Sequence, residues 1–248
     1  MTAQEIIDYM VSQGDEDQRR ILTGFFKTAP GEYGYGDKFL GLKVPQTREV
    51  VKIAKQLPLG EVAQLLTSPW HEVRLCGLLI MVGQFEKQAT KRLANDECAI
   101  QRRDEIVTMY LDNAERANNW DLVDLSAPKI LGHWLMLPTR LGNKQAIMDR
   151  LAFSDNLWKQ RMSMVSTWKT IQMGDAAWCL RYAEIHLHHP HDLMHKAVGW
   201  MLRELGKRLN MDLLRDFLHQ HAHDMPRTAL RYAIEKMTSE EREYWMSR

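Results

Sequence analysis

Hydrophobic residues recur along the chain with the spacing of one face of an α-helix. Three segments show this spacing clearly: Ile6, Ile7, Met10 and Val11; Val50, Ile53, Ala54 and Leu57; and Val73, Cys76, Gly77, Ile80 and Met81. Residues three or four positions apart lie on the same side of a helix, so the pattern predicts amphipathic helices. No run of alternating β-branched residues between turn signals predicts a strand. We therefore expect an all-α fold.

Helix-breaking residues divide this pattern into segments of ordinary helical length. The breakers are Pro30-Gly31, Pro58, Ser68-Pro69, Pro138, Pro190 and Pro226. A cation three residues before a small or apolar residue recurs early in four predicted helices: Arg74-x-x-Gly77, Arg161-x-x-Met164, Lys196-x-x-Gly199 and Arg227-x-x-Leu230. The gaps are 87, 35 and 31 residues, and the first has room for two units. Such spacing is typical of HEAT-like helix pairs stacked into a curved superhelical solenoid.

The recurring cations have two interpretations. One helix of each pair lines the concave face of a solenoid, where a row of Lys or Arg would form a basic groove suited to a phosphate backbone. Alternatively, each cation pairs with an Asp or Glu of the next repeat. For Arg74 and Arg227 both interpretations are open.

Composition limits the classes of protein. With 248 residues, 45% hydrophobic and 26% charged, the chain has the balance of a globular protein with a well-buried core. The net charge of +1 does not itself indicate a nucleic-acid binder, although segregated charges would still form a basic face. Cys76, Cys98 and Cys179 are odd in number and contain no CxxC pair, which excludes a disulfide framework and a zinc site. Neither a signal peptide nor an apolar run of roughly 18 residues is visible, so we expect a cytoplasmic monomer that does not bind membranes.

The segment Asn118–Ser126 is the densest in groups that carry chemistry. Trp120 and Asp124 are four residues apart, so an indole and a carboxylate share one helical face, whereas Asp121 faces differently. The alternatives are core packing for Trp120 and a helix cap or dipole contact for Asp124, and spacing excludes neither. The apolar residues of the segment are expected to point into a core: Leu122, Val123 and Leu125.

Two further aromatic–cation pairs occur at helical spacing. Trp158 and Arg161 are three residues apart, as are Trp200 and Arg203. A Trp beside an Arg suits stacking on a sugar or base together with a grip on phosphate. It also suits an Arg whose stem extends over a buried indole.

Four segments, in order, resemble the signature segments of the DNA alkylation repair enzymes of the AlkD type. They are residues 37–45, 119–124, 156–161 and 196–204, and the resemblance runs from about residue 20 to residue 235. It implies a single domain over residues 1–248, a solenoid of HEAT-like repeats with duplex DNA in a concave, basic groove. It also implies excision of N3- and N7-alkylated purines without a pocket for a flipped base.

The resemblance implies a role for each matching residue. Asp124 would be the catalytic carboxylate, and Trp120 and Trp200 would be aromatic walls against the backbone of the damaged nucleotide. Arg161 would hold phosphate near the lesion, and Arg203 would support the DNA contact. Tyr33 and Tyr35 are alternatives for an aromatic contact near the N-terminus, and spacing does not choose between them. The remaining candidates for contact with DNA are Lys38, Arg74, Lys196 and Arg227.

The chemistry agrees with these residue types. An N3- or N7-alkylated purine is positively charged and leaves without protonation, so one carboxylate that stabilises an oxocarbenium-like sugar and positions water is sufficient. Indole faces add cation–π stabilisation. We expect double-stranded DNA with alkylated bases as the partner, and neither a cofactor nor a metal. The alternatives are a non-catalytic HEAT-like protein that binds damaged or branched DNA, and a protein-binding scaffold.

Two other motifs give weaker indications of function. Gly31-x-x-Gly34-x-Gly36 follows no predicted strand, so a nucleotide-phosphate loop is not indicated. The segment 186–191 contains four histidines without Cys or acidic residues at metal-ligand spacing. We expect it to be a solvated helix end, with contact to phosphate as the alternative.

Overall fold

The computed structural model describes residues 1–248 and consists of helices and loops without a β-strand. A single isolated bridge pairs the backbones of Lys38 and Trp70. The expected all-α fold is confirmed. The chain divides into two compact units, Met1–Ser126 with Pro138–Arg140, and Ala127–Leu137 with Leu141–Arg248. The single domain with a concave DNA-binding face stays a prediction. No helix is both long and apolar enough to cross a membrane.

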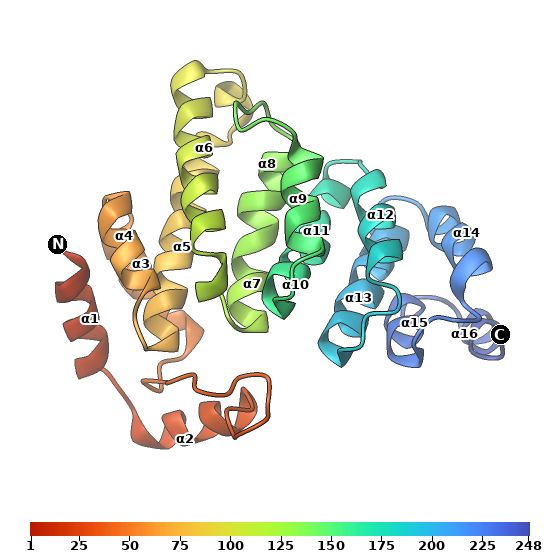
Figure 1. Cartoon of the computed structure of the whole chain (residues 1–248), viewed down its shortest axis with the longest axis horizontal. Helices are drawn as coiled ribbons and strands as arrows, with labels where there is room; N and C mark the ends of the chain where they lie inside the picture. Colours follow the sequence, from red (N-terminus) through yellow and green to blue (C-terminus); the bar gives the residue numbers. More distant parts are fainter. The chain divides into compact units, whose positions relative to one another are not determined.

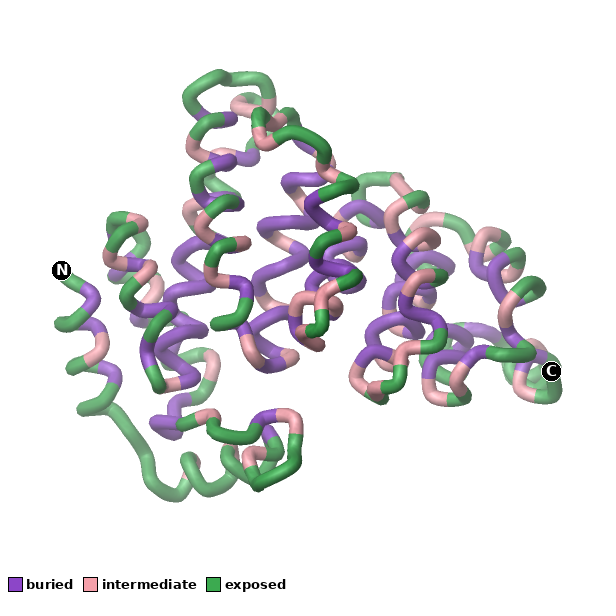
Figure 2. Tube along the Cα trace, viewed as in Figure 1, coloured by how far each residue is buried: buried purple, intermediate pink, exposed green.

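The first unit is built around one buried helix, α5 (Figure 1). Its helices are α1 (Ala3–Ser12), α2 (Glu16–Phe25), α3 (Val44–Ala54), α4 (Leu59–Leu66), α5 (His71–Gln88), α6 (Glu97–Asp112) and α7 (Trp120–Ala127), with short 3-10 turns η1 (Lys91–Leu93) and η2 (Ala114–Arg116). Every residue from His71 to Val82 is buried, because α3, α4 and α6 all pack against α5 (Figure 2). At Gly77 an added Cβ would lie 3.0 Å from the side chain of Leu66, so the glycine permits α4 to approach closely.

Helix α2 differs from the other α-helices of the first unit because it has no buried residue (Figure 2). The side chain of Asp15 caps it by accepting a hydrogen bond from the amide of Gln18. Ile21 and Phe25 remain more than half exposed. Helix α2 therefore packs only shallowly on the rest of the unit, where Gln18 and Leu22 are half-buried.

The second unit is organised around α13 (Figure 1). Its elements are the π-helical turn η3 (Pro128–Gly132), α8 (His133–Leu135), α9 (Lys144–Ala152), α10 (Leu157–Val165), α11 (Thr167–Gln172), α12 (Ala177–Ile185), α13 (Asp192–Arg208), α14 (Met211–His221), α15 (Arg227–Ala233) and α16 (Ser239–Met246). Helices α10, α11, α12, α14 and α15 pack against α13. An added Cβ at Gly199 would lie 2.3 Å from the carbonyl oxygen of Ala229, so only glycine lets α15 approach this closely. Gly77 and Gly199, which the sequence pattern placed in equivalent positions, are thus both sites of close helix packing.

Candidate active site

Helix α7 carries the Trp120–Asp124 pair predicted from the sequence. Both side chains line one cavity of about 490 Å³ in the first unit. Leu122 and Val123 are fully buried, which confirms their expected core positions. Leu125 is only half-buried and lines the same cavity, so the expectation of a core position was wrong for this residue.

The cavity is mostly apolar and has charged groups on its wall. Helices α2, α3, α5 and α7 and the segment between α2 and α3 all contribute to it. Its charged or ionisable side chains are those of Lys43, His71, Glu72, Asp121 and Asp124. Carboxylates therefore outnumber cations in a site where charge interactions are poorly screened.

Four rings form a stacked row beside this cavity. The centroid of the Trp120 ring lies 5.3 Å from that of Phe26, with 29° between the ring planes. Phe26 stacks on Phe39 at 5.1 Å, and Phe39 stacks on the imidazole of His71 at 4.5 Å. Phe25 meets Trp120 edge-on at 5.9 Å. Aromatic pairs of this kind contribute roughly 0.5–1.5 kcal/mol each beyond burial, so the row restrains the indole of Trp120.

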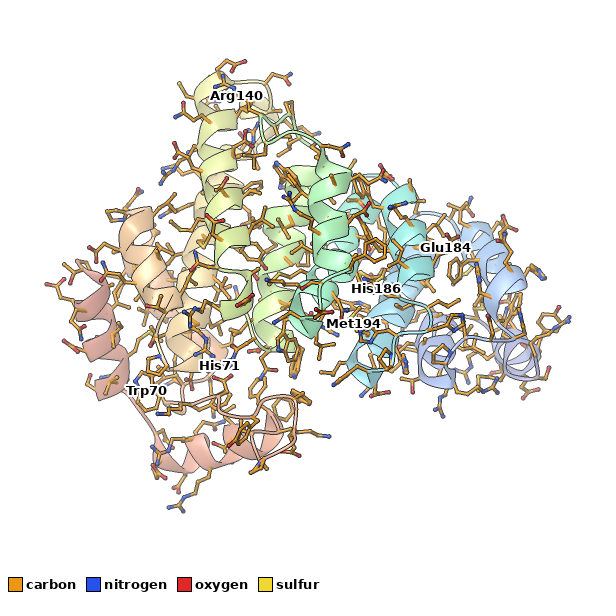
Figure 3. The ribbon with its side chains drawn as sticks, viewed as in Figure 1. Trp70, His71, Arg140, Glu184, His186 and Met194 are labelled. Carbon is orange, nitrogen blue, oxygen red and sulfur yellow. The ribbon has the colours of Figure 1, made fainter.

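His71, which Figure 3 labels, is the first residue of α5. Its ring lies between two carboxylates. Its Nδ1 is 2.7 Å from Oδ2 of Asp37, and its Nε2 is 2.9 Å from Oδ2 of Asp121. A neutral imidazole has one N–H, so only the protonated ring donates both hydrogen bonds. Burial lowers the pKa of His71, but Asp121 and Asp37 outweigh it and raise the pKa to about 9. The ring is therefore a buried cation at neutral pH.

The second oxygen of Asp37 holds Arg74. Arg74 Nη2 donates to Asp37 Oδ1 at 2.6 Å, and the guanidinium also donates to the carbonyl oxygens of Ser68 and Arg116 and to the side chain of Asn118. Burial raises the pKa of Asp37, but the hydrogen bond from His71 and the charges of His71 and Arg74 hold it below its ordinary value. Arg74 itself is 5% exposed. Arg74 therefore forms an ion pair, but its partner precedes it in the chain and is not a carboxylate of the next repeat. Contact of Arg74 with DNA stays a prediction.

The segment 37–45 holds the start of α2 against α5. The carboxylate of Glu72 accepts hydrogen bonds from the backbone amides of Leu40, Gly41 and Leu42 at 2.9, 2.9 and 3.1 Å. Gly41 has φ +91°, and an added Cβ would lie 2.0 Å from the carbonyl oxygen of Asp15. Only glycine fits this backbone conformation and this approach, which explains the glycine in the motif.

Three aromatic residues from the N-terminal part of the chain line the cavity: Phe25, Phe26 and Phe39. Sequence reasoning missed Phe25 and Phe26, although they form an aromatic pair a few residues before the glycine-rich loop. Tyr33 is half-buried and Tyr35 is 67% exposed, and neither lines the cavity. Contact of Tyr33 and Tyr35 with DNA stays a prediction, as it does for the exposed Lys38.

The other predicted site residues lie in the second unit. Arg161 is buried on α10 and donates from Nη1 to the carbonyl oxygen of Leu193. Trp200 is half-buried on α13. Arg203, also on α13, forms ion pairs with Glu235 and Glu204.

Lys196 and Arg227 are also in the second unit. The ammonium group of Lys196 lies 2.7 Å from the carboxylate of Asp192, one turn earlier on α13. Arg227 is exposed at the start of α15, where its guanidinium donates to the carbonyl oxygen of Met246. Both side chains are open to solvent in part, so a contact with phosphate stays a prediction for each.

The histidine cluster differs from the expectation of a solvated helix end. His186 is 2% exposed, and its Nε2 is 2.8 Å from the hydroxyl of Ser163. Burial and the neighbouring His189 lower the pKa of His186 to about 4. The expectation was wrong for His186 because the end of α12 packs on α10, whereas His188 is solvated as expected. The structure groups no three His, Cys, Asp or Glu side chains so that they could hold a metal ion.

Comparison with known proteins gives a family match over nearly the whole chain. The profile of a family described as DNA alkylation repair enzyme matches residues 6–237. This chain belongs to that family. A solved structure described as a predicted DNA alkylation repair enzyme from Enterococcus faecalis has the same fold, with a TM-score of 0.65 and 14% sequence identity over 91% of this chain and 97% of that chain. No curated protein sequence matches this chain.

Membership of the DNA alkylation repair family defines the coarse function. The protein has a role in the repair of alkylated DNA, and DNA is its partner. The match spans all four segments of the resemblance, and the helical-repeat fold expected from them is confirmed.

Proposed function

We propose that this member of the DNA alkylation repair family is a DNA glycosylase. It hydrolyses the N-glycosidic bond of positively charged N3- and N7-alkylated purines in duplex DNA, as a cytoplasmic monomer. The observation that carries the proposal is the shared position of Trp120 and Asp124 on the wall of one mostly apolar cavity. When a cationic base leaves, a carboxylate stabilises the positive charge on the sugar, and an indole beside it adds cation–π stabilisation.

The electrostatics of the cavity support a cationic leaving group. As the glycosidic bond lengthens, positive charge moves from the alkylated base to the sugar, and the carboxylate of Asp124 stabilises that charge and orients water. The low polarity of the lining strengthens the interaction relative to bulk water. Because no acid protonates the base, neutral bases are poor substrates.

The second unit supplies the grip on DNA in this proposal. Arg161 and Trp200 contact the backbone near the lesion, and Arg203, Lys196 and Arg227 bind phosphates. Arginine has five N–H donors, so contacts within the protein and with phosphate coexist on Arg161 and Arg203. Lys38, Tyr33 and Tyr35 extend the contact from the first unit.

The test compares lesions of different charge in one duplex sequence. Wild-type protein in excess is incubated with duplexes that contain 7-methylguanine, hypoxanthine or no lesion, and the released base is quantified. We expect release of 7-methylguanine alone, since hypoxanthine is neutral and leaves poorly without an acid. Salt-dependent binding without release of any base would contradict the glycosylase and favour a DNA-binding protein without catalytic activity.

A further inference from the structure

Four buried side chains of alternating charge link three segments of the first unit. The series runs from Asp121 on α7 through His71 on α5 to Asp37, which precedes α3, and ends at Arg74 on α5. Their side chains are 9%, 2%, 1% and 6% exposed, respectively. Burying charges is costly unless they are paired, so the series keeps its arrangement only while each member is present.

The series fixes the first turn of α7. Asp121 directly follows Trp120 and lies three residues before Asp124. Its Oδ2 binds His71, and its Oδ1 is buried without a hydrogen-bond partner, so His71 provides the hydrogen bond that holds this carboxylate. A helix turns by about 100° per residue, so an anchored Asp121 sets the directions of Trp120 and Asp124.

The same imidazole reaches Trp120 by a second route. Its face stacks on Phe39, and it also packs on Phe26 with 5.0 Å between centroids. Phe26 in turn stacks on the indole of Trp120. His71 therefore restrains Trp120 in two ways, through its hydrogen bond to Asp121 and through the stacked rings of Phe39 and Phe26.

We propose that His71 is a positioning residue for base release, which holds Trp120 and Asp124 at the cavity through Asp121 and through the rings of Phe26 and Phe39. The inference rests on the proposed function, since it assigns a role in the same reaction. His71 does not touch the reacting atoms. It acts on the geometry in which Asp124 meets the sugar.

The kinetic test separates positioning from stability. Single-turnover release of 7-methylguanine is measured against protein concentration for wild type, His71→Gln, Asp121→Asn and the double variant. Misplacement by about 1 Å can cost about 10²-fold in rate, so each single variant should lower the saturating rate by ~10- to 10²-fold. The concentration that gives half the saturating rate should not change, and the double variant should be no slower than the slower single variant. Saturating rates equal to wild type, with only the half-saturating concentration raised, would overturn the proposal.

Arg103→Gln is a matched control in the same unit. Arg103 is fully buried on α6 and donates to the carbonyl oxygens of Gln88, Leu93 and Ala94, so its loss also destabilises the fold. We expect Arg103→Gln to lower stability while its saturating rate stays at the wild-type value. An equal fall in rate for Arg103→Gln and His71→Gln would show a general effect of instability and contradict positioning by His71.

A spectroscopic measurement tests positioning by His71 even if the protein is not a glycosylase. The protein is labelled with 5-fluorotryptophan, and the fluorine resonance of Trp120 is assigned from its loss in Trp120→Phe. We expect this resonance to move in His71→Gln and in Asp121→Asn, and to stay in place in Arg103→Gln. A wild type that releases no base would refute the glycosylase without affecting this readout. A Trp120 resonance that does not move in either variant would refute the positioning itself.

Discussion

His71 in the first unit and His186 in the second are both 2% exposed, yet they differ in charge. His71 binds a carboxylate at each ring nitrogen, and its pKa is raised to about 9. His186 binds the hydroxyl of Ser163, and its pKa is lowered to about 4. Figure 3 labels both rings, each within its own unit.

The comparison shows that the partners of a buried histidine, more than its burial, decide its charge. Burial lowers the pKa of both rings. Asp37 and Asp121 reverse this effect at His71, whereas a hydroxyl has no charge with which to oppose it at His186. The first unit thus retains a buried cation on the wall of the cavity that the proposed catalytic carboxylate also lines, and the second unit retains a neutral ring next to α10.

The largest expected difference is in stability at neutral pH. His71→Gln leaves two buried carboxylates without their shared cation, and breaking a buried ion pair costs about 3–5 kcal/mol. His186→Gln replaces one neutral hydrogen-bonding group with another and should cost about 1 kcal/mol. Urea denaturation at pH 7 measures both free energies of unfolding. Equal losses in the two variants would contradict the difference in charge.

A second expected effect is the loss of stability from the first unit at alkaline pH. Because the pKa of His71 is higher in the folded than in the unfolded state, its contribution is complete below about pH 6.5 and is lost as the pH rises through about 9. The free energy of unfolding of wild type minus that of His71→Gln should fall by on the order of 3 kcal/mol between these limits. Denaturation curves at intervals of pH measure this difference, and a value independent of pH would mean that His71 is neutral.

The second unit should show the opposite dependence at acid pH. The pKa of His186 is lower in the folded state, so the unfolded chain binds more protons and stability falls as the pH drops below about 6.5. Between pH 6.5 and 5, His186 should account for about 2 kcal/mol of this fall. His186→Gln should therefore lose less stability than wild type over that interval. A steeper loss of stability in His186→Gln than in wild type would contradict the lowered pKa of His186.

The smallest expected effect is on the salt dependence of DNA affinity. Lys38 in the first unit and Lys196 in the second each have a side chain open to solvent. If both bind phosphate, Lys38→Ala and Lys196→Ala should each reduce the slope of log affinity against log salt by about one. Titrations of unmodified duplex at several salt concentrations measure the slope. An unchanged slope would exclude that residue from the phosphate contacts.

The sequence predicted what depends on local periodicity. Ile6 and Met10 are buried on α1, and Trp120 and Asp124 share a cavity from positions one turn apart. The same pattern was wrong for Val11 and Ile53, which are 45% and 67% exposed because they lie at the edge of their apolar faces. Phe25 and Phe26 were missed because Phe26 meets Phe39 and Trp120 only in the folded chain. The role of Arg74 was left open for the same reason, since its carboxylate partner lies 37 residues away.

The role of His71 could not be predicted from the sequence either, because it depends on long-range pairing. Its two partners are 34 and 50 residues distant, and a lone histidine at a helix start gives no sign of either. Leu125 was expected in a core because it is apolar, but an apolar side chain also suits the lining of a cavity. Residue type alone does not separate the two environments.

The most direct test of the account is release of 7-methylguanine from a defined duplex by wild type and by Asp124→Asn, with duplex affinity measured on the same samples. Asp155→Asn, an exposed Asp ahead of α10, is the control for loss of a negative charge. We predict a rate about 10²- to 10³-fold lower for Asp124→Asn, as for removal of a group that stabilises transition-state charge, with affinity unchanged and with Asp155→Asn equal to wild type. Equal release by wild type and Asp124→Asn would contradict the assignment of Asp124 as the catalytic carboxylate.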